Sequence, residues 1–456
     1  MSETDIILRT KTKNSRKILF GAPRLGTSIL LGIEGWALLT LYTTGYGMLP
    51  ILAGVSISIG YLTIACSQFL LGLLSDSKFT RWGRRKPYIV IFAPFLGISI
   101  IFLLLPGLII DNNDKNALFL WMVIWEIIFR FSYGVTTPYQ AWMAEEFPIE
   151  ERPKVSQFQN TFNYLGSGIM AIFSIIILTS YVNELKLARE APISFIPPIL
   201  LKVSLPIISF GIMTIVLFFI IALKMPTEPH FKIESSLKDS LKTILKNKNF
   251  MHVILMVGIS GLGWSIIEKI MLKYLTDALD LHGTDYIIAA VSLILTIFIF
   301  LYFWRRSIQK RGKMRTLLYV FVLGAIFLPI SLLGLIPLDN YLVVGIIFIV
   351  GIGCVLGAWY LFPYIVYADV AEDDEKLTGE LKAGIYSGFP SIILNIFQAV
   401  GAFLVGAILT LPDISPSTFS YSMGLIFFGP MVSVILLISY FYTKKFVKLD
   451  YDWEKK

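Results

Sequence analysis

The stretch GLLSDSKFTRWGRRKPY, residues 72–88, decides the fold class because it places a short basic turn between two long apolar runs. A single acid, Asp76, is followed by five basic residues within nine positions: Lys78, Arg81, Arg84, Arg85 and Lys86. Pro87 then opens the next apolar run, in the first turn of a helix, where a missing N–H costs nothing. Short loops rich in Lys and Arg are typical of the cytoplasmic ends of membrane hairpins. The stretch therefore predicts two membrane-spanning helices joined in the cytoplasm.

The composition places the whole chain among membrane proteins. Of the 456 residues, 56% are hydrophobic and 15% are charged, and the mean hydropathy is +0.73. A soluble domain would carry roughly a quarter charged residues. The formal net charge of +8 is spread over short loops, which fits loops facing an anionic leaflet and argues against nucleic-acid binding. Cys66 and Cys354 stand singly inside apolar runs, so we expect neither a disulfide framework nor a metal cluster.

Apolar stretches long enough to cross a bilayer occur twelve times, which places both ends of the chain on the same side. Of the 39 Lys and Arg residues, 32 lie in the tails and loops of that side. The positive-inside rule identifies this side as the cytoplasm. The predicted spans cover residues 25–49, 50–74, 87–110, 117–144, 155–181, 197–223, 251–276, 284–304, 316–336, 340–367, 384–410 and 419–443.

These spans predict an all-α integral membrane protein with two six-helix halves and cytoplasmic termini. The first span is too long for the apolar core of a signal peptide. Within the middle loop, apolar residues of 233–250 share one helical face and lysines another, which predicts an interfacial amphipathic helix. The expected organisation is an N-terminal tail 1–24, a bundle 25–223, a cytoplasmic linker 224–250, a second bundle 251–443 and a C-terminal tail 444–456.

The two halves repeat weakly. RRSIQKRGKMR (305–315) lies between spans 8 and 9, and its Gly312 matches Gly83, although Arg305 stands where Asp76 would be. TPYQAWMAEE (137–146) at the end of span 4 has a partner in FPYIVYADVA (362–371) at the end of span 10. With the spans and the charge distribution, these motifs make the chain resemble the major facilitator transporters, whose two six-span halves are parallel repeats.

The basic loop narrows the resemblance. Residues 72–88 resemble the loop signature of the glycoside–pentoside–hexuronide:cation symporters, which include the melibiose permeases and the plant-type sucrose/proton symporters. GIEGWALLTLYTTGYG (32–47) is similar to a Gly-Trp-Ala-Leu stretch of the sucrose branch. Gln68, four residues before Gly72, matches that branch as well.

Two later segments resemble the same branch. GIYSGFPSIILNIFQ (384–398) keeps the spacing of Gly384, Gly388 and Gln398. The segment 138–145 is similar to Pro-x-Arg-Ala-Leu-x-Ala-Asp, with Gln140 in place of the Arg and Glu145 in place of the Asp. The resemblance implies transport of a sugar.

The chain also departs from these relatives at the ion-binding positions. The span-2 aspartates that bind the coupling cation in melibiose permeases match Ile64 and Gln68, so a sodium site of that type is absent. The span-4 aspartate tied to proton coupling in sucrose symporters matches Phe129. Proton coupling must then use another carboxylate, of which Glu126 is the nearest.

Charged residues inside the spans carry the sharpest functional signal, because a charge at that depth needs a partner or a cavity. Glu126 and Arg130 are four residues apart and can pair on one helical face, either as a structural pair or as a titrating acid beside a cation. Glu34 has no basic neighbour in sequence, so it shuttles a proton or bridges to another helix. Glu268 and Lys269 point about 100° apart, so at least one of them needs a partner on another helix.

A neutral sugar also needs hydrogen-bonding groups and an aromatic wall. Each polar residue alone can equally join two helices. The expected substrate- and proton-binding set is Glu34, Trp36, Gln68, Glu126, Arg130, Gln157, Asn160, Glu268, Lys269, Asn395 and Gln398.

A second set of residues is expected to gate transport. Glu145 and Asp369 lie at the inner ends of spans 4 and 10, within reach of the basic loop. Bridges of this kind hold one state of the transporters that the chain resembles, whereas the basic cluster alone would only mark topology. The expected gating residues are Asp76, Arg81, Gly83, Arg84, Arg85, Glu145 and Asp369.

The sequence shows no Walker loop, zinc motif or nucleophile elbow, which argues against ATP-driven transport and against a membrane hydrolase. We predict a secondary transporter of the plasma membrane, functional as a monomer, that carries a sucrose- or maltose-like sugar with protons and uses no cofactor or metal. One alternative keeps the fold but carries lysolipids or amphiphilic compounds. Another is a transport-inactive sensor or scaffold.

Overall fold

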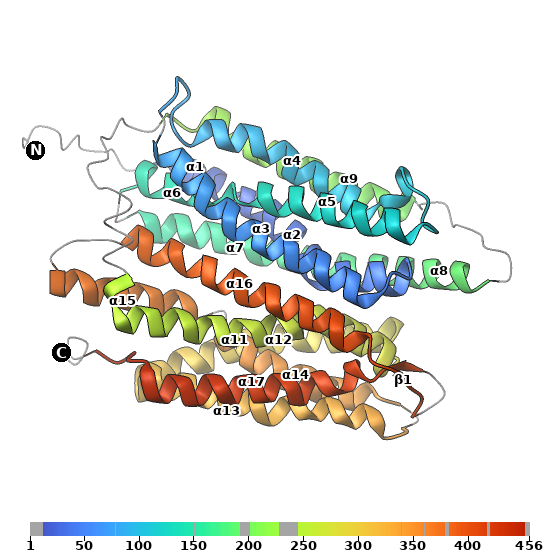
Figure 1. Cartoon of the computed structure of the whole chain (residues 1–456). Helices are drawn as coiled ribbons and strands as arrows, with labels where there is room; N and C mark the ends of the chain where they lie inside the picture. The colour runs from blue at the N-terminus through green and yellow to red at the C-terminus, as the bar shows by residue number, and fades with distance from the viewer. Residues whose placement is uncertain are drawn as a thin grey trace, which may run out of the picture. The chain divides into compact units, whose positions relative to one another are not determined.

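The computed structural model describes residues 12–77, 79–148, 151–191, 201–227, 245–338, 340–359, 361–378, 383–416 and 420–451. This part of the chain is almost entirely helical (Figure 1). Twelve of its helical segments are long and apolar enough to cross a membrane. The twelve predicted spans and the all-α membrane class are thereby confirmed.

In the described residues of the first half there are nine helices, with short π- or 3₁₀-helical turns between or after them. The π turns are η2 (Leu41–Gly45) and η4 (Phe173–Leu178), and η3 (Pro106–Leu108) is a 3₁₀ turn. The helices are α1 (Asn14–Gly21), α2 (Pro23–Thr40), α3 (Pro50–Ser77), α4 (Lys86–Leu104), α5 (Lys115–Tyr133), α6 (Thr136–Glu146), α7 (Arg152–Ile172), α8 (Thr179–Glu190) and α9 (Leu201–Lys224).

The second half follows the same plan. Its π turn is η5 (Tyr274–Ala278), its 3₁₀ segment is η6 (Leu328–Leu335), and two short strands, β1 (Asp413–Ile414) and β2 (Tyr421–Ser422), pair antiparallel. The helices are α11 (Lys248–Lys273), α12 (Gly283–Arg311), α13 (Lys313–Phe327), α14 (Leu342–Trp359), α15 (Phe362–Thr378), α16 (Ala383–Leu409) and α17 (Gly424–Phe446). Most of the predicted linker helix 233–250 lies outside the described residues.

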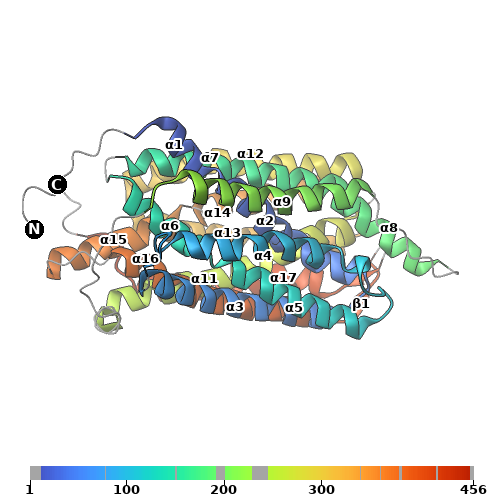
Figure 2. The ribbon, with the colours of Figure 1, turned by 90° about the horizontal axis from the view of Figure 1, so that it is seen from above.

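The chain divides into two compact units. Unit 1 comprises Met1–Gly47 with Cys66–Ile233, and unit 2 comprises Met48–Ala65 with Glu234–Lys456. Within unit 1, α2 packs along α7 and α4 along α9. Within unit 2, α11 packs along α16, and the two run side by side in both views (Figures 1 and 2). The first part of α3 belongs to unit 2, where Gly54 meets α16.

Glycine makes this crossing of α3 and α16 close. A Cβ atom added to Gly54 would lie 2.7 Å from the Cα of Gly406 and 2.8 Å from the carbonyl oxygen of Ala402. Contacts this short leave no room for a side chain. Small residues at such a position let two helix backbones approach directly, as in other membrane helix pairs.

Spans 4 and 10 were each predicted as one helix, and the structure breaks both. In span 4, α5 ends at Tyr133 and α6 begins at Thr136, while in span 10 α14 ends at Trp359 and α15 begins at Phe362. Pro138 and Pro363 explain the shared break, because proline cannot donate to the carbonyl four residues earlier. The apolar pattern continues across both breaks and therefore conceals them.

The structure repeats several local features in the two halves. The Oη of Tyr42, in η2, donates to the carbonyl of Leu103 at 2.8 Å, and the Oη of Tyr274, in η5, donates to the carbonyl of Ser331 at 3.3 Å.

The two basic segments share a glycine conformation as well. Gly83 and Gly312 both have positive φ, at 94° and 83°. Glycine adopts this conformation without steric cost, which explains why both basic segments contain one. The shared positive φ supports the sequence match of Gly83 with Gly312.

Candidate functional site

Three charged side chains predicted to bind substrate or protons form one buried cluster in unit 1. Arg130 of α5 donates from Nε to Oε1 of Glu126 at 3.0 Å, and from Nη2 to Oε2 of Glu34 on α2. Glu34 and Glu126 are 0% exposed and Arg130 is 2% exposed. We call these residues the acid–arginine cluster.

The local sequence explains how α5 presents this cluster. The helix begins after Asp114, whose carboxylate accepts from the backbone N–H groups of Asn116 and Ala117, each at 3.0 Å. Glu126 and Arg130 then follow one turn apart on its buried face, where the i,i+4 spacing permits their contact. Of the two sequence interpretations of Glu34, the structure shows the bridge to another helix.

The cluster contains two carboxylates and one guanidinium. Arginine stays protonated in proteins, so it neutralises only one of the two acids. A second charged carboxylate at this depth costs several kcal/mol of desolvation unless it is neutralised. The cluster therefore gathers two buried carboxylates around one guanidinium.

The chain departs from these sequence relatives at Phe129, the neighbour of Arg130 on α5, and at Ile64 and Gln68 on α3. Phe129 and Ile64 are buried, at 0% and 4% exposure. Ser67 of α3 donates to the carbonyl of Arg130 at 3.3 Å and so fixes this end of α5. Gln68 is partly exposed, and its Oε1 is buried without a hydrogen-bond partner among the described residues.

The basic loop forms ion pairs within unit 1. Oε1 of Glu145 lies 2.6 Å from Nη2 of Arg84 and 2.6 Å from Nη2 of Arg85. Both arginines are largely buried, at 7% and 3% exposure. In the loop, Thr80 and Gly83 exchange two backbone hydrogen bonds of 3.0 Å, which turns the chain tightly before Arg84. The side chain of Asp76 lies outside the described residues, and Arg81 is exposed.

Unit 2 has a matching ion pair that the sequence interpretation missed. Nζ of Lys313 lies 2.6 Å from Oδ2 of Asp369. The sequence predicts that Asp369 can reach the basic loop of unit 1, and within unit 2 the structure pairs it with Lys313. Lys313 follows Gly312 just as Arg84 follows Gly83, so the register of the repeat contained the signal.

A second charged pair lies on α11. Nζ of Lys269 is 3.9 Å from Oε2 of Glu268 and 5.2 Å from the centre of the Tyr61 ring on α3. Lys269 is 1% exposed, whereas the Glu268 side chain is 34% exposed. As the sequence predicts, one member of the pair, Lys269, finds a partner on another helix. Glu268 keeps an accessible carboxylate at the depth of the span.

The neutral polar residues predicted for sugar binding are spread over several helices. In unit 1, Gln157 and Asn160 are exposed on α7, and Trp36 is partly exposed on α2, two residues after Glu34. In unit 2, Asn395 is 8% exposed, and the backbone carbonyl of Gln398 accepts from Oγ of Ser265 at 2.9 Å. Polar side chains exposed on a span are expected to face water or polar groups instead of lipid.

A small cavity lies in unit 2 between α11, α13, α14 and α15. Its volume is about 20 Å³, enough for roughly one water molecule. Its lining is apolar and includes Trp264 and Trp359, whose ring centroids are 5.7 Å apart. A sugar ring does not fit into this cavity as it stands. Among the described residues, no group of three or more His, Cys, Asp or Glu side chains could hold a metal ion.

Comparison with known proteins adds a family match. The family model described as MFS/sugar transport protein matches residues 19–445. The chain is 24% identical over 463 residues to an uncharacterized symporter of Synechocystis sp., with 86% of this chain and 84% of that protein covered.

Three solved structures with a similar fold are transporters. A D-xylose–proton symporter superimposes with a TM-score of 0.63 at 12% identity, covering 95% of this chain and 97% of its own. The nucleoside transporter NupG gives 0.60 at 11% identity, covering 94% and 98%. The fucose:proton symporter FucP of E. coli gives 0.51 at 11% identity, covering 95% and 98%. At these identities the likeness concerns the fold alone.

Proposed function

The chain belongs to the MFS/sugar transport protein family, and from this membership we propose that it moves a neutral sugar or glycoside across the membrane together with protons, by alternating access. The family consists of transporters, so the chain is a multi-pass membrane transporter and not an enzyme. The proposal adds the coupling ion, the sucrose- or maltose-like cargo and the plasma membrane as its location.

The acid–arginine cluster is the observation that carries proton coupling. Glu34, Glu126 and Arg130 are buried together, and one guanidinium cannot neutralise both carboxylates. In the proposed cycle one acid is protonated while the cluster is closed to water. Opening of the transporter admits water, which stabilises the charged carboxylate and releases the proton.

Neutral cargo is supported by the pairing of the other described charges at the depth of the spans. Lys269 lies beside Glu268, and Lys273 lies 2.6 Å from Asp277 one turn later. In each of these two described pairs the lysine is balanced by a carboxylate, so neither pair offers an excess positive charge to an anionic substrate. The polar groups of α7 and the partly exposed Trp36 supply the hydrogen-bonding and aromatic surfaces that a sugar requires.

Uptake into proteoliposomes tests the proposal. The purified chain is reconstituted, an inside-alkaline pH gradient is imposed, and uptake of labelled sucrose, maltose and a lysophospholipid is measured in parallel. We expect accumulation of at least one sugar that disappears when a protonophore collapses the gradient. Sugar accumulation that survives the protonophore would remove proton coupling, and movement of the lysolipid alone would favour the amphiphile carrier.

Matched glutamine variants connect the uptake to the cluster. Glu126→Gln and Glu34→Gln each remove one titrating acid, so we expect sugar exchange without gradient-driven accumulation. Glu184→Gln is the control, because Glu184 forms an exposed ion pair with Lys202 at 2.7 Å, and it should accumulate sugar as the unmodified protein does. Binding of sugar without any exchange in the unmodified protein would favour a transport-inactive sensor.

A further inference from the structure

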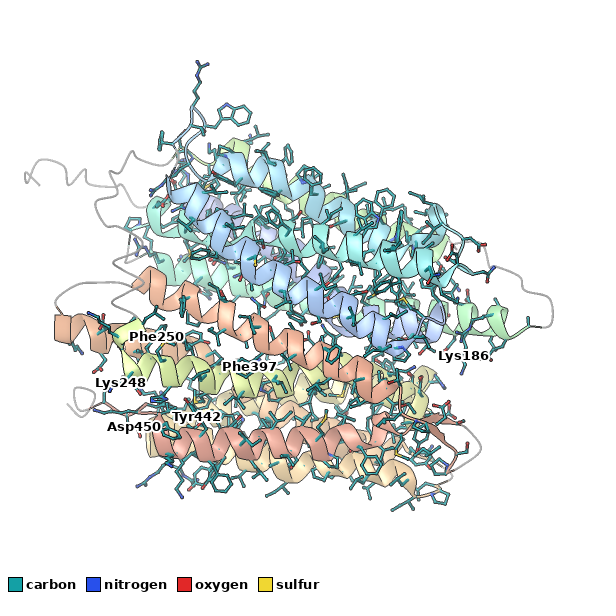
Figure 3. The ribbon with its side chains drawn as sticks, viewed as in Figure 1. Lys186, Lys248, Phe250, Phe397, Tyr442 and Asp450 are labelled. Carbon is teal, nitrogen blue, oxygen red and sulfur yellow. The ribbon has the colours of Figure 1, made fainter. Side chains whose placement is uncertain are left out.

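Residues 447–451, which follow α17, pack against the end of unit 2 and lie close to the Lys313–Asp369 pair. Along residues 447–451, Val447, Leu449 and Tyr451 are buried, at 8%, 2% and 1% exposure, while the residues between them are exposed. This alternation is that of an extended strand with one face on the protein. Figure 3 shows Asp450 at the same end of unit 2 as Lys248 and Phe250. We call residues 447–451 the C-terminal strap.

Asn249, at the start of α11, holds the strap by its backbone. Its Oδ1 accepts from the N–H of Lys448 at 2.9 Å, and its Nδ2 donates to the carbonyl of Lys448 at 3.0 Å. The same Nδ2 lies 3.0 Å from Oη of Tyr451. One side chain thus satisfies both backbone groups of Lys448 and fixes the register of the strap.

Asp450 of the strap caps helix α13. Its Oδ1 accepts from the backbone N–H groups of Lys313 at 2.9 Å and of Met314 at 3.3 Å. A carboxylate satisfies the free N–H groups of a helix N-terminus and is favoured there by the helix dipole. A Cβ atom on Gly312 would lie 3.1 Å from Oδ1 of Asp450, so the glycine also makes room for the cap.

Tyr451 contacts the side chain of the same lysine. Nζ of Lys313 lies 5.9 Å from the centre of the Tyr451 ring, within the range of a cation–π interaction. The same Nζ forms the 2.6 Å ion pair with Asp369 on α15. The strap therefore fixes Lys313 twice, by its backbone through Asp450 and by its ammonium group through Tyr451.

From these contacts we infer that Asp450 and Tyr451 are positioning residues for the Lys313–Asp369 ion pair, so that the C-terminal strap sets how readily this pair opens. The inference rests on the proposed function only for the consequence in transport. No strap residue is assigned to the sugar or to the proton. Loss of the strap contacts should free the ammonium group of Lys313 and change the maximal transport rate without changing the KM for sugar.

Amine labelling of the full-length protein tests the positioning directly. The purified protein is treated briefly with an amine-reactive ester, and the modification of Lys313 relative to the exposed Lys310 is measured by mass spectrometry. In Tyr451→Leu, loss of the ring should raise the relative labelling of Lys313 by about two- to fivefold. Asp450→Ala should raise it as well, whereas Tyr451→Phe keeps the ring and should restore most of the protection.

Tyr440→Leu is the matched control. Tyr440 on α17 also carries a lysine over its ring, with Nζ of Lys444 5.8 Å from the centre, but that lysine is not part of the Lys313–Asp369 pair. Its loss should leave Lys313 protected. If Tyr451→Leu does not fold, Tyr451→Met, which fills the buried position with a flexible side chain, takes its place with the same expected result.

Two results overturn the inference. One is unchanged labelling of Lys313 in folded Tyr451→Leu and Asp450→Ala proteins. The other is equal labelling of Lys313 in Tyr440→Leu and Tyr451→Leu. Sugar uptake is measured on the same samples, and its absence from the unmodified protein counts against the proposed function alone, because the labelling ratio does not depend on transport.

Discussion

The ammonium nitrogen of Lys269 lies 5.2 Å from the centre of the Tyr61 ring, in a part of unit 2 where the lysine is 1% exposed. The adjacent Glu268 carboxylate is 3.9 Å away, at the outer limit of an ion pair. Burying a charged lysine costs several kcal/mol of desolvation unless its charge is stabilised. The electron-rich face of the Tyr61 ring supplies part of it.

Replacement of Tyr61 should therefore reveal the contribution of the ring. We expect Tyr61→Leu to lower the free energy of unfolding by about 2 kcal/mol, because it removes a desolvated cation–π contact. Tyr61→Phe keeps the aromatic face and should lose less. Thermal unfolding in detergent measures both, with Tyr302→Leu, at a position 62% exposed, as the control. Equal stability of Tyr61→Leu and Tyr61→Phe would contradict a role for the ring.

Removal of Arg130 should destabilise the fold more than removal of either acid. Arg130→Met leaves two buried carboxylates without their guanidinium, and breaking such a buried ion pair costs about 3–5 kcal/mol. The triple variant Glu34→Gln/Glu126→Gln/Arg130→Met removes all the charges and should regain much of that stability without regaining proton coupling. Thermal unfolding and gradient-driven uptake separate the two effects. A triple variant no more stable than Arg130→Met would show that the loss of stability in Arg130→Met is not electrostatic.

The attachment of α1 should weaken in acid. Burial raises the pKa of Glu151, but hydrogen bonding from Thr12 and the ion pair with Lys17 at 3.2 Å outweigh it and hold the pKa below its usual value of 4.5. A lowered pKa contributes stability that is present above pH 4.5 and lost as the pH falls through the folded-state pKa. Proteolytic cleavage before α1, measured in steps of about half a pH unit from pH 6 to 3, should accelerate as the pH falls below 4.5. Glu151→Gln should remove this acid-dependent step, and an unchanged profile in that variant would refute the assignment.

The crossing of α3 and α16 should not tolerate a side chain. Gly54→Val places atoms where the backbone of Gly406 lies, and such overpacking costs about 1–3 kcal/mol or separates the helices. Gly168→Val is the control, because a Cβ atom there meets nothing within 4 Å. Thermal unfolding and sugar exchange are compared for both variants. A Gly54→Val protein as stable and active as the control would show that the helices do not need this close approach.

Hydropathy and charge distribution predict the spans well, because a bilayer requires long apolar helices and collects basic loops on one side. The contact of Glu126 with Arg130 is likewise predictable, since it depends only on spacing within one helix. The bridge from Arg130 to Glu34 is different, because it joins residues 96 positions apart on separate helices. No local pattern determines which helices pack together.

The pairing of Asp369 with Lys313 is not evident from the sequence for a related reason. When Pro138 is matched with Pro363, Asp369 aligns with Ala144 and not with Glu145, so the two acids are displaced by one residue. The structure nevertheless gives both an equivalent partner, Lys313 in one half and Arg84 in the other. The extended, one-sided packing of the C-terminal strap can also be predicted, because residues 447–451 alternate between apolar and polar.

The uneven charge of the acid–arginine cluster has an electrical consequence. Without a proton the cluster carries one net negative charge, and with a proton it carries none. A transmembrane voltage does work of about 2.3 kcal/mol per elementary charge and 100 mV. In the proposed proton-coupled cycle it therefore acts on the empty, unprotonated carrier and not on the loaded one. Voltage steps applied without sugar should therefore displace charge in the unmodified protein and leave Glu34→Gln/Glu126→Gln with a displacement of opposite sign. The membrane potential would then change the rate at which the empty carrier reorients across the membrane.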